Sequence, residues 1–490
     1  LVAAGRTLFG AKPPKGQELE DQYFGSIPER VLAYMADVEA QLFQLGVPVK
    51  TRHNEVAPAQ YEIAPVFEDS NLGTDHQMLT MEVLRKTAPK YGMVCLLHEK
   101  PFAGINGSGK HNNWSMSTDT GENLLEPGDT PHENTQFLVF CAAVIRAVNK
   151  YAKLLRVSVA SAGNDHRLGA NEAPPAIISI FLGDQLQDVL DQIAEAGSAK
   201  SSKQGGFMDI GAAVLPKLPK HAGDRNRTSP FAFTGNKFEF RAVGSSFSIA
   251  GPNTVLNTIV AESLDYIATE LEKAKAAGKE LYQSIGELLP SIIKENRRIL
   301  FLGDNYSAEW HAEAERRGLP NLRTTPDALA VILEKESIDL FTKYKVYSER
   351  ELHSRFAILC EGYIKTLTIE GNCTALIAKT MILPAALKYQ EQVARSITAL
   401  KEAGAKVPSR QTVLLDSLSG TIDQFQAAIE KLEAALSHHA EGGLLDHCKH
   451  ARDQVMGAMN EVRKFGDQLE TMVADELWPL PTYREMLFFK

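Results

Sequence analysis

The chain has 490 residues, of which 44% are hydrophobic and 23% are charged, a composition typical of globular proteins. Its formal net charge of −9 argues against general binding of nucleic acid or anionic membranes, because the chain as a whole repels phosphate groups. No apolar run approaches the roughly 18 residues of a membrane span. The five cysteines are scattered without a Cys-x-x-Cys pair, so we expect reduced thiols in a cytoplasmic protein.

The predicted elements begin after a Gly- and Pro-rich loop over residues 1–26. Because no Met opens the chain, we expect the sequence to be incomplete at its N-terminus. Apolar residues spaced three and four apart predict a helix over 28–45. Alternating patterns predict strands over 47–54 and 60–66, and a helix over 75–91 follows them.

The stretch 106–115 organises the rest of the prediction. A strand predicted over 93–98 leads into it, and two glycines flank Ser108, which allows a tight bend and a close approach to a ligand. Residues 104–110 match the Gly-x-x-x-x-Gly-Lys start of a phosphate-binding P-loop. A P-loop continues with Ser or Thr and a helix, whereas His111 and a strand-like pattern follow here, so we reject that interpretation.

Helix and strand patterns alternate in the middle of the chain. We expect a helix over 131–155, a charged loop over 161–175, a strand over 176–182, a helix over 185–196 and a strand over 236–243. This alternation predicts a domain that contains both helices and a sheet.

Helical patterns alone fill the last part of the chain. Two apolar stripes with Gly442 and Gly443 between them predict a helical hairpin. Such a region either mediates assembly or forms a solvent-facing bundle without a special role, and the sequence favours neither. The predicted helices cover residues 253–277, 326–343, 348–365, 374–403, 410–438 and 443–473.

Two glutamates near the first strands are candidate metal ligands. Glu55 and Glu62 lie on segments joined by residues 57–59, where a proline bends the connection. Two carboxylates that face one cavity repel each other unless a cation lies between them. His111 and Glu239 could join them, and such an oxygen-rich set suits Mg²⁺ or Mn²⁺ better than Zn²⁺. Surface glutamates on a sheet edge are the alternative interpretation.

The strand over 236–243 places Lys237, Glu239 and Arg241 on one face and aromatic residues on the other. A solvated sheet edge is the common explanation of such charges. Because the aromatic face must be buried, the charges lie either on an open surface or in a cavity. A cavity wall with alternating charge would suit phosphates, a metal ion and a carboxylate together.

Two loops carry further charged candidates. Arg167 and Glu172 form either an exposed ion pair of little energetic worth or a functional pair. In the functional interpretation, the arginine binds a substrate carboxylate and the glutamate lies on a mobile flap. Arg225 and Arg227 could supply positive charge to a transferring phosphoryl group.

Four motifs occur here in the order found in glutamine synthetases, and the chain resembles that family. Residues 12–16 and the long C-terminal helical region resemble its large type III form. The resemblance implies an α+β fold in which antiparallel strands form a curved, barrel-like sheet flanked by helices, as in the glutamine synthetase/guanido kinase type. It implies a catalytic domain over 1–260, incomplete at its N-terminus, and a mainly α-helical region over 261–490 that includes the type III extension. The motifs are Asn54–Glu62, Asn106–His111, Asn171–Pro174 and Phe238–Arg241.

The resemblance also implies a reaction. In this family ATP phosphorylates the side chain of glutamate, and ammonia displaces phosphate from the γ-glutamyl phosphate. The implied ligands are glutamate, ammonium and ATP, with Mg²⁺ or Mn²⁺ as cofactor and without a nucleic-acid or membrane partner. The implied assembly is a homo-oligomer of two hexameric rings, a dodecamer, in the cytoplasm.

The resemblance assigns roles to the matching positions. Glu55 and Glu62 would bind the metal near glutamate, while His111 and Glu239 would bind the metal that bridges the ATP phosphates. Glu172 would close the flap over the intermediate and help to deprotonate ammonium. Glu55, Glu172 and Arg227 are the expected catalytic residues, the last stabilising the transferring phosphoryl group. Glutamate would contact Asn106, Gly107, Arg167 and Arg241, ammonium would lie near Tyr23, and ATP would contact Phe67, Asn113, Ser115, Lys237 and Arg227.

The chain departs from the family pattern in three respects. Residues 1–22 lack the Glu-x-Glu strand that supplies further metal-binding glutamates, and the small N-terminal β-domain of the family is absent. Lys237 and Asn113 stand where other branches have Arg and His. We therefore expect an incomplete metal site in the chain alone. Two alternatives stay open: a ligase that joins another amine to glutamate, and a catalytically inactive homologue with an assembly or regulatory role.

Overall fold

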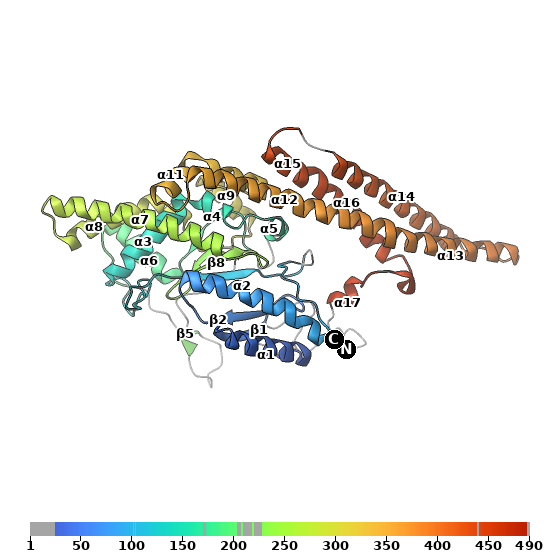
Figure 1. Cartoon of the computed structure of the whole chain (residues 1–490), viewed down its shortest axis with the longest axis horizontal. Helices are drawn as coiled ribbons and strands as arrows, with labels where there is room; N and C mark the ends of the chain where they lie inside the picture. The colour runs from blue at the N-terminus through green and yellow to red at the C-terminus, as the bar shows by residue number, and fades with distance from the viewer. Residues whose placement is uncertain are drawn as a thin grey trace. The chain divides into compact units, whose positions relative to one another are not determined.

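The computed structural model describes residues 25–100, 102, 104–169, 173–202, 207–208, 218–219, 228–438 and 441–487. These residues belong to two compact units, one ending at His353 and the other beginning at Ser354 (Figure 1). The chain divides between the two units at residues 353 and 354, within a helix that runs from Glu349 to Ile377. No helix in the described part of the chain is both long enough and apolar enough to cross a bilayer.

The first unit contains small sheets and many helices, as the sequence predicts. Its strands are β1 (Val49–Asn54), β2 (Tyr61–Pro65), β3 (Lys110–Trp114), β4 (Ile180–Phe181), β5 (Phe207–Met208), β6 (Leu218–Pro219), β7 (Phe231–Phe233) and β8 (Phe238–Val243). Its helices are α1 (Glu29–Gln44), α2 (Ser70–Thr87), α3 (Thr135–Lys150), α4 (Ala152–Val157), α5 (Ala162–Arg167), α6 (Asp184–Ala196), α7 (Ala250–Ala276), α8 (Leu281–Asn296), α9 (Ala308–Arg316), α10 (Thr325–Leu329) and α11 (Lys335–Lys343).

The central sheet has four strands in the order β3-β8-β7-β4. The strand β8 is antiparallel to both of its neighbours, whereas β4 and β7 run parallel. The sheet is therefore mixed, and the prediction of purely antiparallel strands is wrong for this pair. The other strands of the described residues form two antiparallel pairs, β1-β2 and β5-β6, and the predicted barrel-like curvature is not confirmed.

Aromatic side chains fix the position of β8. Phe238 and Phe240 are fully buried, and the rings of Phe238 and Phe231 stack with centroids 5.1 Å apart. Phe233 meets Phe238 edge-on at 5.3 Å. Burial of each such side chain contributes about 1.5–3 kcal/mol, so this face anchors the strand firmly. The opposite face of β8 therefore presents its polar residues in fixed positions.

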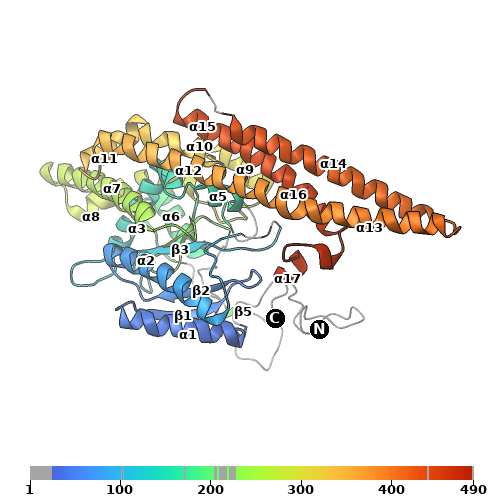
Figure 2. The same ribbon diagram turned by 45° about the vertical axis from the view of Figure 1, so that its right-hand side comes forward.

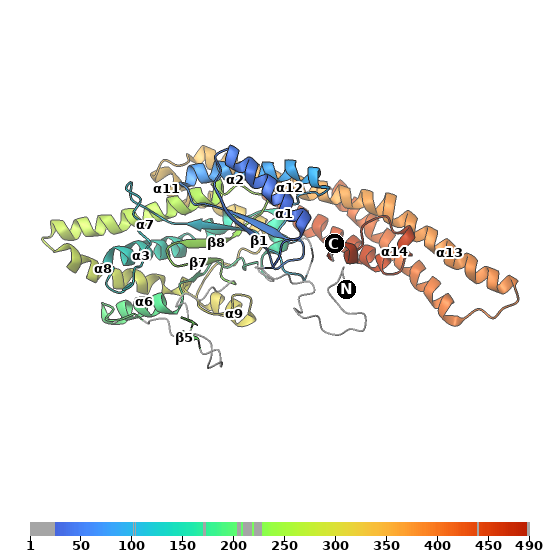
Figure 3. The same ribbon diagram turned by 90° about the horizontal axis from the view of Figure 1, so that it is seen from below.

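Three long helices, α3, α7 and α8, pack against one another beside this sheet (Figure 3). Asn134 accepts a hydrogen bond from the backbone N–H of Phe137 and so caps the start of α3. The helix predicted over 131–155 begins at Thr135 and is interrupted at Tyr151. Arg146 on α3 binds Glu262 on α7 at 2.7 Å, which ties the two helices together.

The helices α1 and α2 lie beside the hairpin of β1 and β2 (Figure 2). Tyr34 on α1 donates to the carbonyl of Leu84 on α2 at 2.8 Å. Asp69 caps α2, so this helix begins five residues before the predicted start at 75. The strand predicted over 93–98 is wrong, because this stretch pairs with no strand of the described residues. Val94 and Leu96 are instead 80% and 75% exposed.

The second unit is helical, as predicted. The helix α12 begins in the first unit, and a π-helical turn over 378–382 joins it directly to α13, so the break predicted between 365 and 374 is wrong. Both predicted apolar stripes are largely buried where α14 packs on α16, with Phe425 and Leu432 on one helix and Val462 and Leu469 on the other. The helices are α12 (Glu349–Ile377), α13 (Leu383–Glu402), α14 (Ser409–Ser437), α15 (Leu444–His450), α16 (Gly457–Glu470) and α17 (Tyr483–Leu487).

Candidate functional site

The hairpin of β1 and β2 brings three metal-ligating side chains together. His53 lies directly opposite Glu62 in the antiparallel register, so both project from the same face. Glu55 follows β1, and its backbone N–H donates to the carbonyl of Gln60 at 2.9 Å, which closes the turn. The ligand atoms of His53, Glu55 and Glu62 all lie within 4.8 Å of one another. Two carboxylates and one imidazole so placed could together hold a divalent cation.

His53 is a candidate ligand that sequence reasoning missed. Its Nδ1 lies 3.8 Å from Glu55 Oε1, and its Nε2 lies 3.6 Å from Glu62 Oε2. Residues two apart in a strand share a face, so the alternation itself places His53 beside Glu55. The two-residue repeat of a strand is therefore the sequence signal that identifies His53 as a candidate ligand.

A second group forms where β3 meets β8. His111 Nδ1 lies 2.9 Å from Glu239 Oε1, and Arg241 donates to Glu239 Oε2 at 3.0 Å. The register between β3 and β8 shifts after Lys110, and this irregularity accompanies the His111 pairing. The side chain of Glu239 is only 12% exposed, so the interpretation of this strand face as a solvated edge is wrong for Glu239.

The charge of Glu239 is fixed by its neighbours. Burial by itself raises the pKa of this carboxyl group, but the hydrogen bond from His111 and the charge of Arg241 outweigh burial and lower the pKa to about 2. Glu239 is therefore an anion at every physiological pH. An anionic oxygen beside an imidazole is a donor set that suits a hard divalent cation.

A hydrogen-bonded chain connects the two groups. Gln60, in the turn of the hairpin, donates to the carbonyl of Ser108 at 3.1 Å and accepts from the N–H of Ser108 at 3.0 Å. The hydroxyl of Ser108 lies 3.2 Å from His111 Nε2. Glu55, Gln60, Ser108, His111 and Glu239 thus form one continuous line of contacts. Among the described residues, His53, Glu55 and Glu62 form a set of three possible metal ligands that His111 and Glu239 do not join, so the two groups are separate.

The glycines of the 106–110 loop are required by close packing. A Cβ atom on Gly107 would lie 2.3 Å from the carbonyl oxygen of Glu99. A Cβ atom on Gly109 would lie 2.6 Å from the guanidinium of Arg167 and from the carbonyl of Val243. The loop then continues as strand β3, which confirms the rejection of a P-loop.

Arg167 lies elsewhere than predicted. It ends the short helix α5 instead of standing in an exposed loop, and it is only 2% exposed. Its guanidinium donates to the carbonyls of Arg241 at 2.8 Å and Val243 at 3.2 Å, and to Asn164 Oδ1 at 3.2 Å. Burial lowers the pKa of Arg167 to about 10. The structure brings Arg167 beside the glycine loop but directs its side chain to the backbone of β8.

The residues predicted to contact the nucleotide lie in two parts of the structure, one at the ends of β3 and β8 and the other after β2. Asn113 pairs with Glu239 across the strands, and the hydroxyl of Ser115 donates to the carbonyl of Asn236, next to Lys237. Asn113, Ser115 and Lys237 therefore lie along the adjoining ends of β3 and β8. Phe67 follows β2, and its ring is 95% exposed.

Three predicted residues, Tyr23, Glu172 and Arg227, lie outside the described residues, as does Arg225. Of the predicted glutamate contacts, Asn106 is partly exposed, whereas Gly107 and Arg241 are buried.

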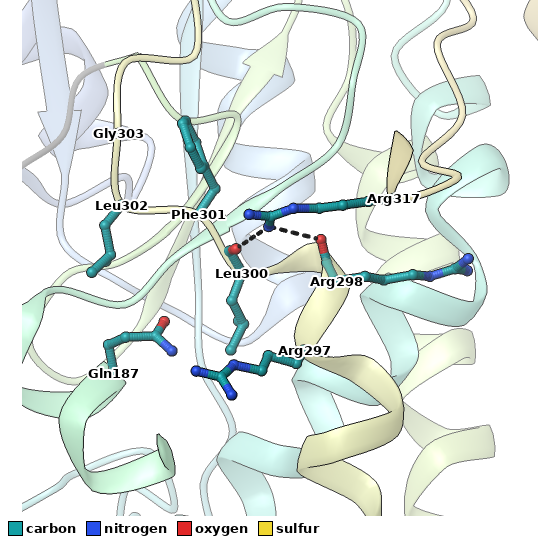
Figure 4. A pocket seen from close by; sticks show the side chains of 8 residues that line it. All are labelled: Gln187, Arg297, Arg298, Leu300, Phe301, Leu302, Gly303 and Arg317. Carbon is teal, nitrogen blue, oxygen red and sulfur yellow. Dashed lines mark hydrogen bonds between the residues drawn. The ribbon is translucent and has the colours of Figure 1, made fainter. Parts of the chain in front are cut away.

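A surface cavity of about 550 Å³ lies apart from these groups (Figure 4). Its lining includes Arg297, Arg298 and Arg317 and, in the described part of the chain, no carboxylate. Arg317 donates to the carbonyls of Leu300 at 2.9 Å and Arg298 at 3.3 Å, and Arg297 binds Asp191 at 3.0 Å. Arg317 therefore holds the local backbone, and Arg297 binds a neighbouring acid.

Comparison with known proteins gives two matching family models. The model "Glutamine synthetase, catalytic domain" matches residues 10–179, and "Glutamine synthetase C-terminal domain" matches residues 284–401.

Relatives match over the whole chain. The "Type-3 glutamine synthetase" of Dictyostelium discoideum is 47% identical over 503 residues, which cover 100% of this chain and 67% of the relative. The "Glutamine synthetase" of Butyrivibrio fibrisolvens is 44% identical over 496 residues, which cover 100% of this chain and 69% of the relative. A solved structure, "CryoEM Plasmodium falciparum glutamine synthetase", overlaps 53% of this chain and 42% of that chain, with a TM-score of 0.37 and 15% identity.

Proposed function

Since the chain belongs to the glutamine synthetase family, and to its type III members in particular, we propose that the two ligand clusters described above are its catalytic centre. The activity is that of a glutamate–ammonia ligase, which forms glutamine. In the proposed route, ATP phosphorylates glutamate and ammonia displaces phosphate from the γ-glutamyl phosphate.

One observation carries the proposal: the contacts that run from the hairpin cluster through Gln60 and Ser108 to His111 and Glu239. These contacts hold two sets of anionic and imidazole ligands in a common framework. Phosphoryl transfer depends on positioning and on charge stabilisation more than on covalent chemistry, so a framework of this kind is what the reaction needs.

The donor sets fit Mg²⁺ or Mn²⁺. Glu55 and Glu62, with His53 beside them, would hold one ion, and His111 with Glu239 would hold the other. When bound, such ions neutralise the charge of the ATP phosphates and of the phosphorylated substrate. Carboxylate oxygens with one imidazole are ligands that these hard ions accept.

The residues around the clusters would orient the substrates. Asn106 and Gly107 would line the glutamate site, and Arg241 would both hold Glu239 and face the phosphoryl oxygens. Arg167 would pair its positive charge with the substrate carboxylate. To do so, its guanidinium must release one of the β8 backbone carbonyls to which it now donates. Glu172 would close over the acyl phosphate and exclude water, because that intermediate hydrolyses readily.

The nucleotide would lie along the adjoining ends of β3 and β8. Asn113, Ser115 and Lys237 line that edge, and the exposed ring of Phe67 offers a stacking surface. Arg227 would stabilise the transferring phosphoryl group and Tyr23 would border the ammonium site. The dodecameric assembly, the cytoplasmic location, the barrel-like curvature and the division into residues 1–260 and 261–490 stay predictions.

The test follows ¹⁵N from ammonium into glutamine, with ATP and either Mg²⁺ or Mn²⁺, and offers methylamine and polyamines as competing acceptors. We expect glutamine as the main product and no product without ATP or without the metal. Preferential transfer of glutamate to another amine would replace this function by that of a related ligase. A protein that binds neither ATP nor Mn²⁺ in calorimetry would support the inactive homologue instead.

A further inference from the structure

Glu99 is a buried carboxylate that the predicted catalytic residues do not include. It stands seven residues before Asn106 and is only 3% exposed. Its carbonyl oxygen abuts the glycine loop, because a Cβ atom on Gly107 would lie 2.3 Å from it. The amide of Gln60 also reaches this carbonyl, at 3.5 Å. The backbone of Glu99 therefore packs directly against the loop that leads to His111.

The side chain of Glu99 turns towards a different segment. Its Oε1 accepts a hydrogen bond from the backbone N–H of Ser245, in the turn that follows β8. A Cβ atom on Gly244 would lie 2.8 Å from Oε1, and one on Gly163 would lie 3.7 Å from Oε2. The carboxylate is thus enclosed between the turn 244–247 and the helix α5.

Lys110 holds the same turn from the other side. Its Nζ donates to the carbonyls of Gly244 at 3.1 Å, Phe247 at 2.8 Å and Ser245. Lys110 is the residue before His111, and it pairs with Val243 at the end of β8. Glu99 and Lys110 therefore both bind the backbone of the turn 244–247, which follows the strand that carries Glu239.

The charge of Glu99 also compensates two buried cations. Burial lowers the pKa of Lys110 to about 8, and the negative charge of Glu99 opposes this shift, whereas Arg85 adds to it. Burial lowers the pKa of Arg167 to about 10, and the charges of Glu99 and Tyr306 partly oppose this shift. Removal of the carboxylate would leave both cations without their main buried counter-charge, which is costly in a low-dielectric interior.

We propose that Glu99 is a positioning residue for the ligation reaction: it locks the loop 106–110 to the turn 244–247 and thereby sets how His111 and Glu239 meet. The inference rests on the proposed function of the His111–Glu239 pair. Glu99 touches neither residue, so it acts through the loop and through Lys110. Outer partners of metal ligands typically contribute about 10- to 100-fold to metal affinity or activity.

The experiment measures Mn²⁺ affinity by the electron paramagnetic resonance signal of free Mn²⁺, together with kcat and the Mn²⁺–ATP concentration for half-maximal rate. The variants are Glu99→Gln, Glu99→Asp, Glu239→Gln and Glu262→Gln. The last is a control, because Glu262 is a partly buried carboxylate, 12% exposed, that binds Arg146 and Lys150 away from the site. Urea unfolding of each variant reports the loss of stability.

Glu99→Gln should weaken Mn²⁺ binding about 10- to 100-fold and raise the half-saturating Mn²⁺–ATP concentration in proportion. Glu99→Asp, which restores the charge, should recover most of the affinity. Glu262→Gln should lose comparable stability and yet keep Mn²⁺ affinity within about twofold. If Glu99→Gln keeps the parental affinity, or if Glu262→Gln loses as much affinity, the positioning role is overturned.

Two further outcomes separate this inference from its premise. Weaker Mn²⁺ binding in Glu239→Gln combined with parental binding in Glu99→Gln overturns the inference and leaves the proposed function intact. Parental binding in Glu239→Gln overturns the proposed metal site itself. If Glu99→Gln does not fold, the double variant Glu99→Gln/Lys110→Met removes one buried charge of each sign, and parental Mn²⁺ affinity in it would equally overturn the inference.

Discussion

The substitution Glu239→Gln tests the role of the strand β8 most sharply. Glutamine keeps the shape of the side chain and an oxygen that accepts from Arg241, but it removes the negative charge that faces His111. We expect two separate losses: a loss of stability in the metal-free protein and a loss of metal binding and turnover.

The expected loss of stability follows from the pKa of Glu239. His111 and Arg241 lower this pKa from 4.5 to about 2 even though burial raises it. That difference corresponds to roughly 3 kcal/mol in favour of the ionised carboxylate. Because the side chain is only 12% exposed, solvent screening removes little of this energy. Glu239→Gln should therefore destabilise the metal-free protein by up to about 3 kcal/mol at pH 7.

The assay is urea unfolding in the presence of a chelator, followed by glutamine formation at saturating Mn²⁺. Turnover should fall more than about 100-fold, beyond what an outer partner of a metal ligand contributes. The control is Glu270→Gln, which removes an exposed partner of Lys273 on α7 and should change stability by less than about 0.5 kcal/mol. Turnover of Glu239→Gln within about tenfold of the parent, with unchanged Mn²⁺ affinity, would refute the assignment of Glu239 to the metal site.

Three other predictions follow from the same structure. His53→Asn should weaken Mn²⁺ binding at the hairpin without a change in the circular dichroism spectrum, and unchanged affinity would remove His53 from the ligand set. Gly109→Ala places a methyl group 2.6 Å from the guanidinium of Arg167 and should destabilise by about 1–3 kcal/mol in urea, whereas the control Gly73→Ala, with open space around it in α2, should be neutral or stabilising. Burial raises the pKa of Glu262, but two cationic donors on α3 outweigh burial, so the folded-state pKa lies below 4.5. The contribution of Glu262 to the free energy of unfolding is complete above pH 4.5 and is lost as the pH falls through the folded-state pKa. The difference in unfolding free energy between the parent and Glu262→Gln should therefore shrink in acid. A difference that stays constant with pH would contradict this.

Much of the local structure could be predicted from hydrophobic periodicity. The strand β8, the hairpin of β1 and β2, the helix α1 and the helical second unit all follow their patterns. The predicted strand over 93–98 shows the limit of this reasoning. Residues 93–97 are all apolar, but a short apolar run cannot show whether a neighbouring strand is available to pair with.

The break predicted between residues 365 and 374 contains a glycine. Gly371 lies inside α12, where its missing side chain allows Leu436 and Val455 to approach; a Cβ atom there would lie 2.9 Å from Leu436. The helix then passes Pro384 through the π-helical turn that precedes it. Gly371 therefore serves packing between helices, which depends on contacts far along the chain, whereas the helix predicted over 374–403 already included Pro384.

Four of the candidate metal ligands could be proposed from the sequence, whereas His53 and the residues that support the site were not. Glu55, Glu62, His111 and Glu239 could be chosen from residue type and strand position. Arg167 was expected on a loop, but it is buried among backbone carbonyls of a distant strand. Glu99 gave no signal at all, because its partners, Lys110 and the turn 244–247, become neighbours only in the folded chain.

The central claim is that the hairpin cluster and the His111–Glu239 pair each hold a divalent cation within one catalytic centre. Anomalous scattering from crystals of the protein soaked in Mn²⁺ measures this directly. We expect one manganese peak bonded to Glu55 and Glu62 and another bonded to His111 and Glu239. Manganese bound only at other places, with these four side chains without metal at saturating Mn²⁺, would contradict it.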